Sequence, residues 1–202
     1  MKALLISGSP TRDGSVEILL RAVAEGVRAA IKDADIEFVR LNDLQFIPCQ
    51  SCGESPEPNL CFYDDDLTPV YRSLIDCDIV VVGSPVFFDS VSAQTKSFID
   101  RCSCFRPPDF QDVTEHNFKK LGFRRRVGGG VLVAGERGRF DLARSVLKGF
   151  FKWTEVDCLD FVTYESPDYN LQGAAADDST ALAAARELGK ILADKALEST
   201  PR

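Results

Sequence analysis

Residues 2–10 read KALLISGSP, and this short stretch decides the fold. Its apolar residues follow one another without alternation, which is typical of a strand buried on both faces, and the run ends at a Gly-Ser-Pro turn. The pattern returns at 78–85, where DIVVV runs into a second Gly-Ser-Pro. Two buried strands that end in the same turn indicate a parallel sheet covered by helices on both sides.

The rest of the chain alternates strand and helix patterns. Further strands are expected at 36–41 (IEFVRL), 127–135 (VGGGVLVAG) and 156–164 (VDCLDFVTY). Helical spacing of apolar residues covers 15–31, 92–101, 140–152 and 178–196. We expect Asp13 or Ser15 to cap the first of these helices and Ser92 to cap the second. This order predicts right-handed crossovers within one domain over residues 1–202.

Composition and charge exclude several classes of partner. Hydrophobic residues make up 45% and charged residues 27%, ordinary values for a globular fold. A net charge of -7 disfavours nucleic acid and anionic membranes, and the short run Arg124-Arg125-Arg126 is interpreted as a solvated face beside a strand. No stretch approaches the roughly 20 apolar residues that span a bilayer. Because the N-terminus also lacks a signal-peptide pattern, we expect a cytoplasmic protein without a membrane partner.

Three loops should meet at one edge of the sheet. The first, SGSPTRDGS at 7–15, combines hydroxyl groups, an arginine and a glycine before a helix, which is the chemistry of a phosphate cradle. The second, GSPVFF at 83–88, offers apolar walls to a flat aromatic ligand. The third, AGERGRF at 134–140, adds glycines and arginines. Since ligands of open α/β sheets bind beyond the carboxyl ends of the strands, these loops predict a cofactor site.

These motifs together resemble a known family. GSPTRDGS, the P-C-x-x-C loop before Asp64-Asp65-Asp66, GSPVFFDSVSAQTKSFIDR and the AGERG turn are similar to the flavodoxin-like NADPH-dependent FMN reductases. The similarity runs over residues 1–195 and is strongest to the iron–sulfur flavoprotein branch. It implies an α/β flavodoxin-like three-layer sandwich with a five-stranded parallel sheet of order 2-1-3-4-5. It also implies bound FMN and a homodimer or homotetramer.

The resemblance assigns cofactor-binding residues by position. Those implied to hold the FMN phosphate are Ser9, Thr11, Arg12, Ser15 and Val16. Those implied to line the flavin ring and ribityl chain are Pro85, Val86, Phe87, Phe88 and Ser90. Those implied to cover the other edge are Ala134, Gly135, Glu136 and Gly138. Val16 stands where a hydroxyl residue is usual, and Arg139 where many relatives have glycine. No catalytic acid or base is assigned, and the charged residues expected nearest the ring are Asp89, Glu136 and Arg137.

A cysteine-rich loop, PCQSCGESPEPNLC at 48–61, follows the second strand. Its spacing matches the cluster loop of the iron–sulfur branch at Cys49, Cys52 and Cys61, but Ser55 stands at the third position, where a cysteine is expected. Thiolates are soft donors that suit iron–sulfur clusters. Four interpretations stay open: a [4Fe–4S] cluster with a non-cysteine ligand, a redox-active Cys49–Cys52 pair beside the flavin, a zinc site, or inert thiols.

The other cysteines are expected to lie elsewhere. Cys77 and Cys158 have apolar neighbours in the sequence and are interpreted as core residues. Cys102 and Cys104 follow the helix at 92–101, which should carry them about 15 Å from the ligand edge of the sheet. The sequence therefore predicts that neither of them joins the cysteine loop. The lone histidine, His116, is expected at the surface.

The function implied by the resemblance is that of an FMN-dependent oxidoreductase. Electrons would pass from NAD(P)H, or from a ferredoxin-type donor if a cluster is present, to a small acceptor such as flavin, a quinone or a metal ion. The alternative is an iron–sulfur flavoprotein or flavodoxin-like electron carrier without turnover of its own. The donor, the acceptor and the oligomeric state stay open at this point.

Overall fold

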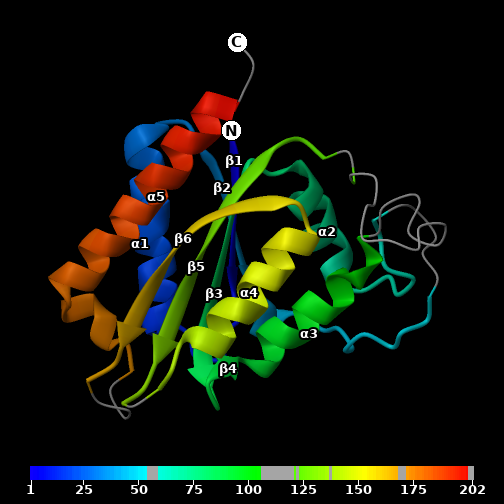
Figure 1. The fold of residues 1–202 in the computed structure, drawn as a ribbon, viewed down its shortest axis with the longest axis horizontal. Coiled ribbons are helices and arrows are strands. Elements are labelled where there is room, and N and C mark those ends of the chain that lie inside the picture. The colour runs from blue at the N-terminus through cyan, green and yellow to red at the C-terminus, as the bar shows by residue number, and fades with distance from the viewer. Residues whose placement is uncertain (54–58, 106–120, 122, 137, 168–171, 200–202) are drawn as a thin grey trace.

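Five parallel strands form the central sheet of the computed structural model (Figure 1). The structure describes residues 1–53, 59–105, 121, 123–136, 138–167 and 172–199. The parallel strands are β1 (Lys2–Ser7), β2 (Asp35–Arg40), β3 (Ile79–Phe87), β5 (Arg126–Ala134) and β6 (Val156–Glu165). Their order is β2-β1-β3-β5-β6, and the short β4 (Ser90–Val91) pairs antiparallel with β3. This confirms the expected order 2-1-3-4-5 of the parallel strands.

Helices cover both faces of this sheet (Figure 1). The described helices are α1 (Ser15–Ala30), α2 (Leu67–Asp76), α3 (Ala93–Arg101), α4 (Asp141–Trp153) and α5 (Ser179–Ser199), with 3-10 turns η1 (Leu41–Asp43), η2 (Cys102–Cys104) and η3 (Ala174–Asp177). Helices α1 and α5 lie on one face, and α2, α3 and α4 on the other. Helix α2 was not predicted as an element of its own. Its proline, Pro69, lies in the first turn, where a missing N–H breaks no helical hydrogen bond.

The core has two layers, one on each side of the sheet. Strands β1, β3 and β5 are buried on both faces, which explains why their apolar residues do not alternate. In the second layer α1 and α5 touch backbone to backbone. A Cβ on Gly26 would lie 2.0 Å from the Arg186 carbonyl oxygen, and one on Gly189 would lie 2.1 Å from that of Val23. Both helices therefore need glycine at the crossing.

The predicted N-cap residue is confirmed for α3 and wrong for α1. Ser92 caps α3 as predicted, since its hydroxyl accepts a hydrogen bond from the Thr95 N–H at 3.2 Å. The prediction for α1 was wrong because its N-cap is Gly14, which has no side chain. The Ser15 hydroxyl is engaged elsewhere and accepts from the Ala175 N–H at 3.2 Å. The start of α1 is therefore without a side-chain cap.

The arginine run before β5 is only partly a solvated face. Arg124 and Arg125 are exposed, but Arg126 is fully buried, so the prediction was wrong at this residue. Its guanidinium donates to the carbonyl oxygens of Leu74, at 2.6 Å, and Thr154. Burial lowers the Arg126 pKa from its usual value. Arg126 ties the end of α2 to the end of α4.

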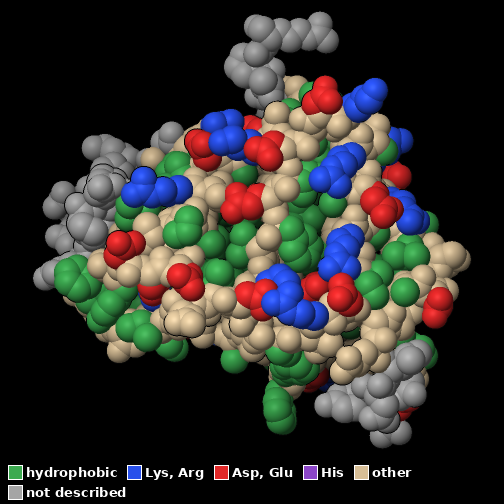
Figure 2. All heavy atoms as spheres, turned by 180° about the vertical axis from the view of Figure 1, so that it is seen from behind, with side chains coloured by type: hydrophobic (Ala, Val, Ile, Leu, Met, Phe, Trp, Pro, Cys, Tyr) green, Lys and Arg blue, Asp and Glu red, His purple; other side chains and the backbone are tan. Residues whose placement is uncertain are grey.

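Surface charges of both signs are mixed on the face seen from behind (Figure 2). Lys and Arg side chains lie there beside Asp and Glu side chains, without a separate basic patch on that face. This agrees with the net charge of -7. Within the described ranges, no helix has the length and apolar character needed to cross a membrane.

Candidate functional site

The first Gly-Ser-Pro turn is held by neighbouring elements. Gly8 donates its N–H to the Gly83 carbonyl at 2.8 Å, so the first Gly-Ser-Pro turn lies beside the second Gly-Ser-Pro. The prediction that the second one also ends its strand was wrong, because β3 continues through Gly83 to Phe87. The Gly8 carbonyl accepts from the Ser92 hydroxyl at 2.7 Å. A Cβ on Gly8 would lie 1.8 Å from the Thr95 hydroxyl oxygen. The turn thus has a fixed shape that only glycine permits.

The start of α1 leaves backbone donors available. Among the described residues, no protein acceptor takes the amide N–H groups of residues 14–17. The first N–H groups of any helix lack intrahelical partners, and together with the helix dipole they attract anions. Ser9 and Thr11 lie just before them, with the Ser9 hydroxyl accepting from the Thr11 N–H at 3.2 Å. This geometry suits a phosphate group.

An apolar wall stands beside this loop. It is formed by the end of β3, at Pro85, Val86 and Phe87, of which Phe87 is about half exposed. Beyond it the chain turns back into β4 through Phe88 and Asp89, whose φ angles are 50° and 62°. Left-handed backbone is uncommon for residues other than glycine. The turn holds Phe88 fully exposed at the tip of the hairpin.

Asp89 connects this hairpin to the loop after β5. Its carboxylate accepts from the Arg139 N–H at 3.1 Å, and its carbonyl accepts from the Ala143 N–H at 3.1 Å. Asp89 therefore holds the β3–β4 hairpin against the loop after β5. Of the other charged candidates, Glu136 is exposed and Arg137 lies outside the described residues.

A cavity of about 420 Å³ opens where these loops meet. The predicted residues that line it are Ser9, Thr11, Ser15, Val16, Pro85, Val86, Phe87, Ala134 and Gly135. The predicted residues outside its lining are Arg12, Phe88, Ser90, Glu136 and Gly138. The volume is in the range of cofactor pockets, and the lining combines hydroxyls and amides with an apolar wall. The cavity can therefore take a phosphorylated aromatic ligand.

Sequence reasoning missed part of this lining. The additional residues are Pro10, Gly14, Val133, Ser166, Gln172 and Gly173. The last three follow β6, whose carboxyl end lies at the same edge of the sheet, so the edge rule could have found them. Gly173 supplies a further local signal, because its φ of 75° is the left-handed conformation that glycine favours.

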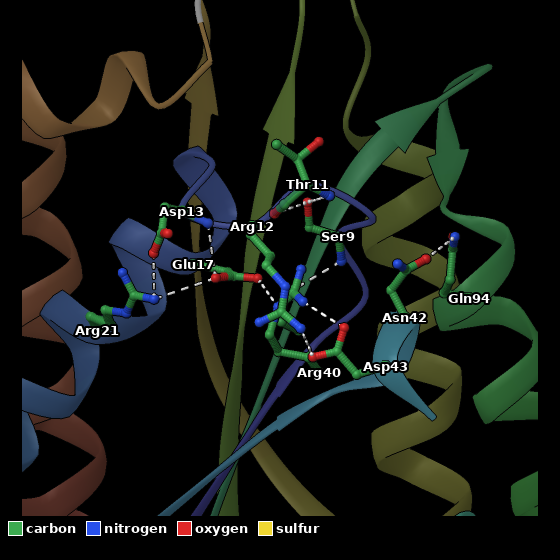
Figure 3. Close-up of polar contacts among 11 residues, drawn as sticks. Ser9, Thr11, Arg12, Asp13, Glu17, Arg21, Arg40, Asn42, Asp43 and Gln94 are labelled. Atoms are coloured by element: carbon green, nitrogen blue, oxygen red, sulfur yellow. Dashed lines mark hydrogen bonds and ion pairs between the residues drawn. The ribbon is translucent and has the colours of Figure 1, made fainter. Parts of the chain in front are cut away.

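The buried carboxylate of Glu17 holds the loop at residues 7–15 in place (Figure 3). Glu17 in the first turn of α1 is 1% exposed, and it accepts from the Asp13 N–H at 3.1 Å. Its other oxygen forms an ion pair with the Arg40 guanidinium, whose side chain is 10% exposed. Arg21 contacts the same carboxylate at 3.4 Å. The pair joins the end of β2 to the loop.

Neutralisation by Arg40 matters for any anion bound above. A bare buried carboxylate would repel a phosphate, whereas an ion pair presents little net charge. Arg40 also pairs with Asp43 at 2.7 Å. Burial alone would lower the Arg40 pKa, but the hydrogen bonds to Glu17 and Asp43 raise it above its usual value. Arg12 is exposed and also pairs with Asp43, at 2.8 Å, away from the cavity lining.

The cysteine loop does not stay at the carboxyl edge as expected. From η1 it runs along α3 toward the C-terminal end of that helix (Figure 1), and Leu44 and Phe46 pack against the core on the way. Arg101, the last residue of α3, donates to the Ile47 carbonyl at 2.7 Å. Cys49 lies at that end of α3, with its sulfur 3.6 Å from the Ser103 hydroxyl, and neither Cys49 nor Cys52 lines the 420 Å³ cavity.

Cys104 lies beside the cysteines of the loop, contrary to the prediction. A pocket of about 40 Å³ is lined by Cys49, Cys52, Cys61 and Cys104 together. Helix α3 does carry Cys104 away from the ligand edge as predicted, but the loop reaches the same place. The interpretation that Cys104 cannot join the loop cysteines was thus wrong, because it assumed a loop confined to one edge.

None of the seven cysteines forms a disulfide, and they differ in burial. Cys77 is buried as predicted, and Cys158 is half-buried beside the core. Ser55 and His116 lie outside the described residues. In the parts of the chain that are described, no three His, Cys, Asp or Glu side chains are placed to hold a metal ion.

Fold and site together define a flavodoxin-like protein with an anion loop and an apolar wall at the carboxyl edge. The family model for NADPH-dependent FMN reductase matches residues 1–165. The chain therefore belongs to the NADPH-dependent FMN reductase family.

A relative agrees with this assignment, and solved structures agree with the fold. An iron–sulfur flavoprotein of Methanocaldococcus jannaschii is 32% identical over 139 residues, covering 68% of this chain and 64% of that relative's own length. Among solved structures, a flavone reductase superposes with a TM-score of 0.72 at 16% identity, covering all of this chain and 66% of the other. A flavodoxin from the domain Archaea superposes with a TM-score of 0.58 at 13% identity, covering 98% and 99%. At these identities the two structures show the fold.

Proposed function

We propose that the chain binds FMN in the 420 Å³ cavity and acts as an oxidoreductase that passes electrons from NAD(P)H to a small acceptor. The observation that carries the proposal is the start of α1, where the amides of residues 14–17 have no acceptor among the described residues and Gly14, Ser15 and Val16 line one cavity with the apolar wall. Membership of the family supports FMN as the ligand. Bound FMN would supply the hydride and one-electron chemistry that side chains lack.

The chain's own residues would bind and orient the cofactor. The α1 amides, with Ser9 and Thr11, would hold the phosphate, and the Glu17–Arg40 pair would keep their loop in place. The wall from Pro85 to Phe87 would exclude water from one side of the ring. Asp89 would keep the hairpin and the loop after β5 at a constant separation. No residue is assigned as a catalytic acid or base.

Partners and assembly are part of the same proposal. The acceptor class is flavin, quinone or a metal ion, and a ferredoxin-type donor replaces NAD(P)H if a cluster is bound. We also propose that residues 1–202 form one FMN-binding domain that assembles as a homodimer or homotetramer in the cytoplasm. Seven cysteine thiols are typical of a reducing compartment. Light scattering of the purified protein tests the assembly.

A charge reversal at the cavity tests the phosphate assignment. Thr11→Glu adds a carboxylate beside the α1 amides, and like charges a few ångströms apart should weaken FMN binding by at least about tenfold. Riboflavin, which lacks the phosphate, should bind both proteins equally. Ser145→Glu, at an exposed position of α4, is the matched control and should leave both affinities unchanged. Equal FMN affinity in Thr11→Glu and wild type would overturn the assignment.

Turnover separates the enzyme from the alternative electron carrier. Steady-state oxidation of NAD(P)H by the purified, FMN-loaded protein supports the oxidoreductase. Reversible one-electron reduction without such turnover would support the carrier and refute the enzyme. Both outcomes leave the FMN site itself intact, so binding and activity are tested separately.

A further inference from the structure

The C-terminal end of α3 carries a cluster of thiols that the flavin site does not use. Cys49, Cys52 and Cys61 of the cysteine loop line one pocket with Cys104 of η2. We propose that these four thiolates bind an iron–sulfur cluster, with Cys104 as the ligand that replaces the missing cysteine of the loop. Nothing in the loop spacing alone points to Cys104, which is separated from Cys61 by α2, β3 and α3.

Contacts on both sides of the loop bring these thiols together. The Cys49 sulfur lies 3.6 Å from the Ser103 hydroxyl, next to Cys104 in the chain. The Cys104 sulfur lies 3.8 Å from the Asn59 carbonyl oxygen, two residues before Cys61. The η2 turn is therefore in contact with both the first and the last part of the cysteine loop.

Arg101 fixes this arrangement from inside. Its side chain is fully buried and forms a two-point ion pair with Asp65, at 2.8 and 3.2 Å. It also donates to the carbonyl oxygens of Ile47 and Tyr63, one on each side of the loop. One charged group thus closes the loop and anchors it to the helix that ends in η2.

Arg101 also points to the charge of the ligand. Its Nε is buried and has no hydrogen-bond partner among the described residues, and Arg101 lines the thiol pocket. A buried N–H without an acceptor is costly, and a guanidinium favours an anion nearby. The guanidinium already pairs with Asp65, so a negatively charged cluster would add sulfur acceptors for the Nε–H.

The donor set and its surroundings favour a cluster over a single ion. Four thiolates are the usual ligands of [4Fe–4S]. A cubane cluster holds its thiolates at its corners, farther apart than the ligands of a single ion. The pocket between the four thiols measures about 40 Å³, and Cys52 at its edge is exposed to solvent.

The choice of Cys104 over Ser55 follows from chemistry. The hydroxyl of a serine has a high pKa, so it rarely loses its proton to become a ligand. A cysteine thiol is deprotonated readily when it coordinates a metal. The proposal places the cluster at the far end of α3 from the phosphate end of the flavin cavity. Its test needs no flavin, so its failure is distinct from failure of the proposed function.

Iron loading of matched variants tests the proposal. The full chain is reconstituted without oxygen from ferrous iron and sulfide, and bound iron, bound sulfide and visible absorbance are measured. Wild type, Ser55→Ala and the control Cys158→Ala should each hold about four iron and four sulfide per chain. Cys104→Ala should hold less than half as much iron. Full loading of Cys104→Ala, loss of loading in Ser55→Ala, or no cluster in wild type would each overturn the proposal.

A second measurement does not depend on the folding of any variant. Wild-type chains with and without the cluster are alkylated, and the modified cysteines are identified by mass spectrometry. Cluster loading should protect Cys49, Cys52, Cys61 and Cys104 from alkylation and leave the labelling of Cys158 unchanged. Equal labelling of Cys104 in loaded and unloaded protein would overturn its role as a ligand.

Discussion

The buried pair Glu17–Arg40 gives the sharpest prediction of stability. The Glu17 carboxylate is 1% exposed and receives the Arg40 guanidinium, Arg21 and the Asp13 N–H. Glu17→Ala removes these contacts and leaves Arg40, 10% exposed, with Asp43 alone. Breaking a buried pair by removing one partner costs about 3–5 kcal/mol. The free energy of unfolding, typically about 5–15 kcal/mol, should fall by that amount.

Matched variants separate the charge from the packing. Glu25→Ala, which breaks the exposed pair with Arg186, should cost less than about 1 kcal/mol. The double variant Glu17→Met with Arg40→Met removes both charges and should recover most of the loss, because apolar residues of similar volume replace buried pairs at little cost.

Urea unfolding followed by circular dichroism measures these differences. The reasoning is refuted if Glu17→Ala is no more destabilising than Glu25→Ala. It is also refuted if the double variant is as unstable as Glu17→Ala, since the loss would then not come from an unpaired charge.

Three further changes have outcomes that follow from single contacts. Gly8→Ala would place a Cβ 1.8 Å from the Thr95 hydroxyl, so FMN affinity in a fluorescence titration should fall at least about tenfold as the turn shifts. Arg126→Met removes the guanidinium from the buried Leu74 and Thr154 carbonyls, although Leu74 also accepts from the Cys77 thiol, and should cost about 2–4 kcal/mol in urea unfolding, whereas exposed Arg125→Met should cost less than about 1 kcal/mol. Burial raises the pKa of Cys77 to about 12. Above about pH 9 only the unfolded chain then releases this proton, so unfolding free energy should fall between about pH 9 and 12 in wild type, and fall less in Cys77→Ala.

The sheet and most of the cavity could be predicted from the sequence because their signals are local. The strand β1 is an unbroken apolar run that ends in the turn at Gly8, whereas β3 begins as such a run but continues through Gly83 before the turn at Phe88. Parallel strands bring those turns to one edge, so Ser9 and Pro85 were expected near each other and line the same cavity. The Ser92 cap was equally local.

The path of the cysteine loop could not be predicted because tertiary contacts decide it. Leu44 and Phe46 pack against the core, and Arg101 binds the loop from a helix about 50 residues away in the sequence. No local pattern encodes that ion pair with Asp65. The same holds for Arg126, which looks like a surface charge in the sequence and is buried by the ends of two helices.

The central claim is that the cavity at the carboxyl edge holds FMN by its phosphate. Isothermal titration of the purified chain with FMN and with riboflavin tests it most directly. The account predicts one FMN per chain and an affinity for riboflavin at least about a hundredfold weaker, because riboflavin leaves the α1 amides without an anion. No binding of FMN, or equal affinity for FMN and riboflavin, would contradict it.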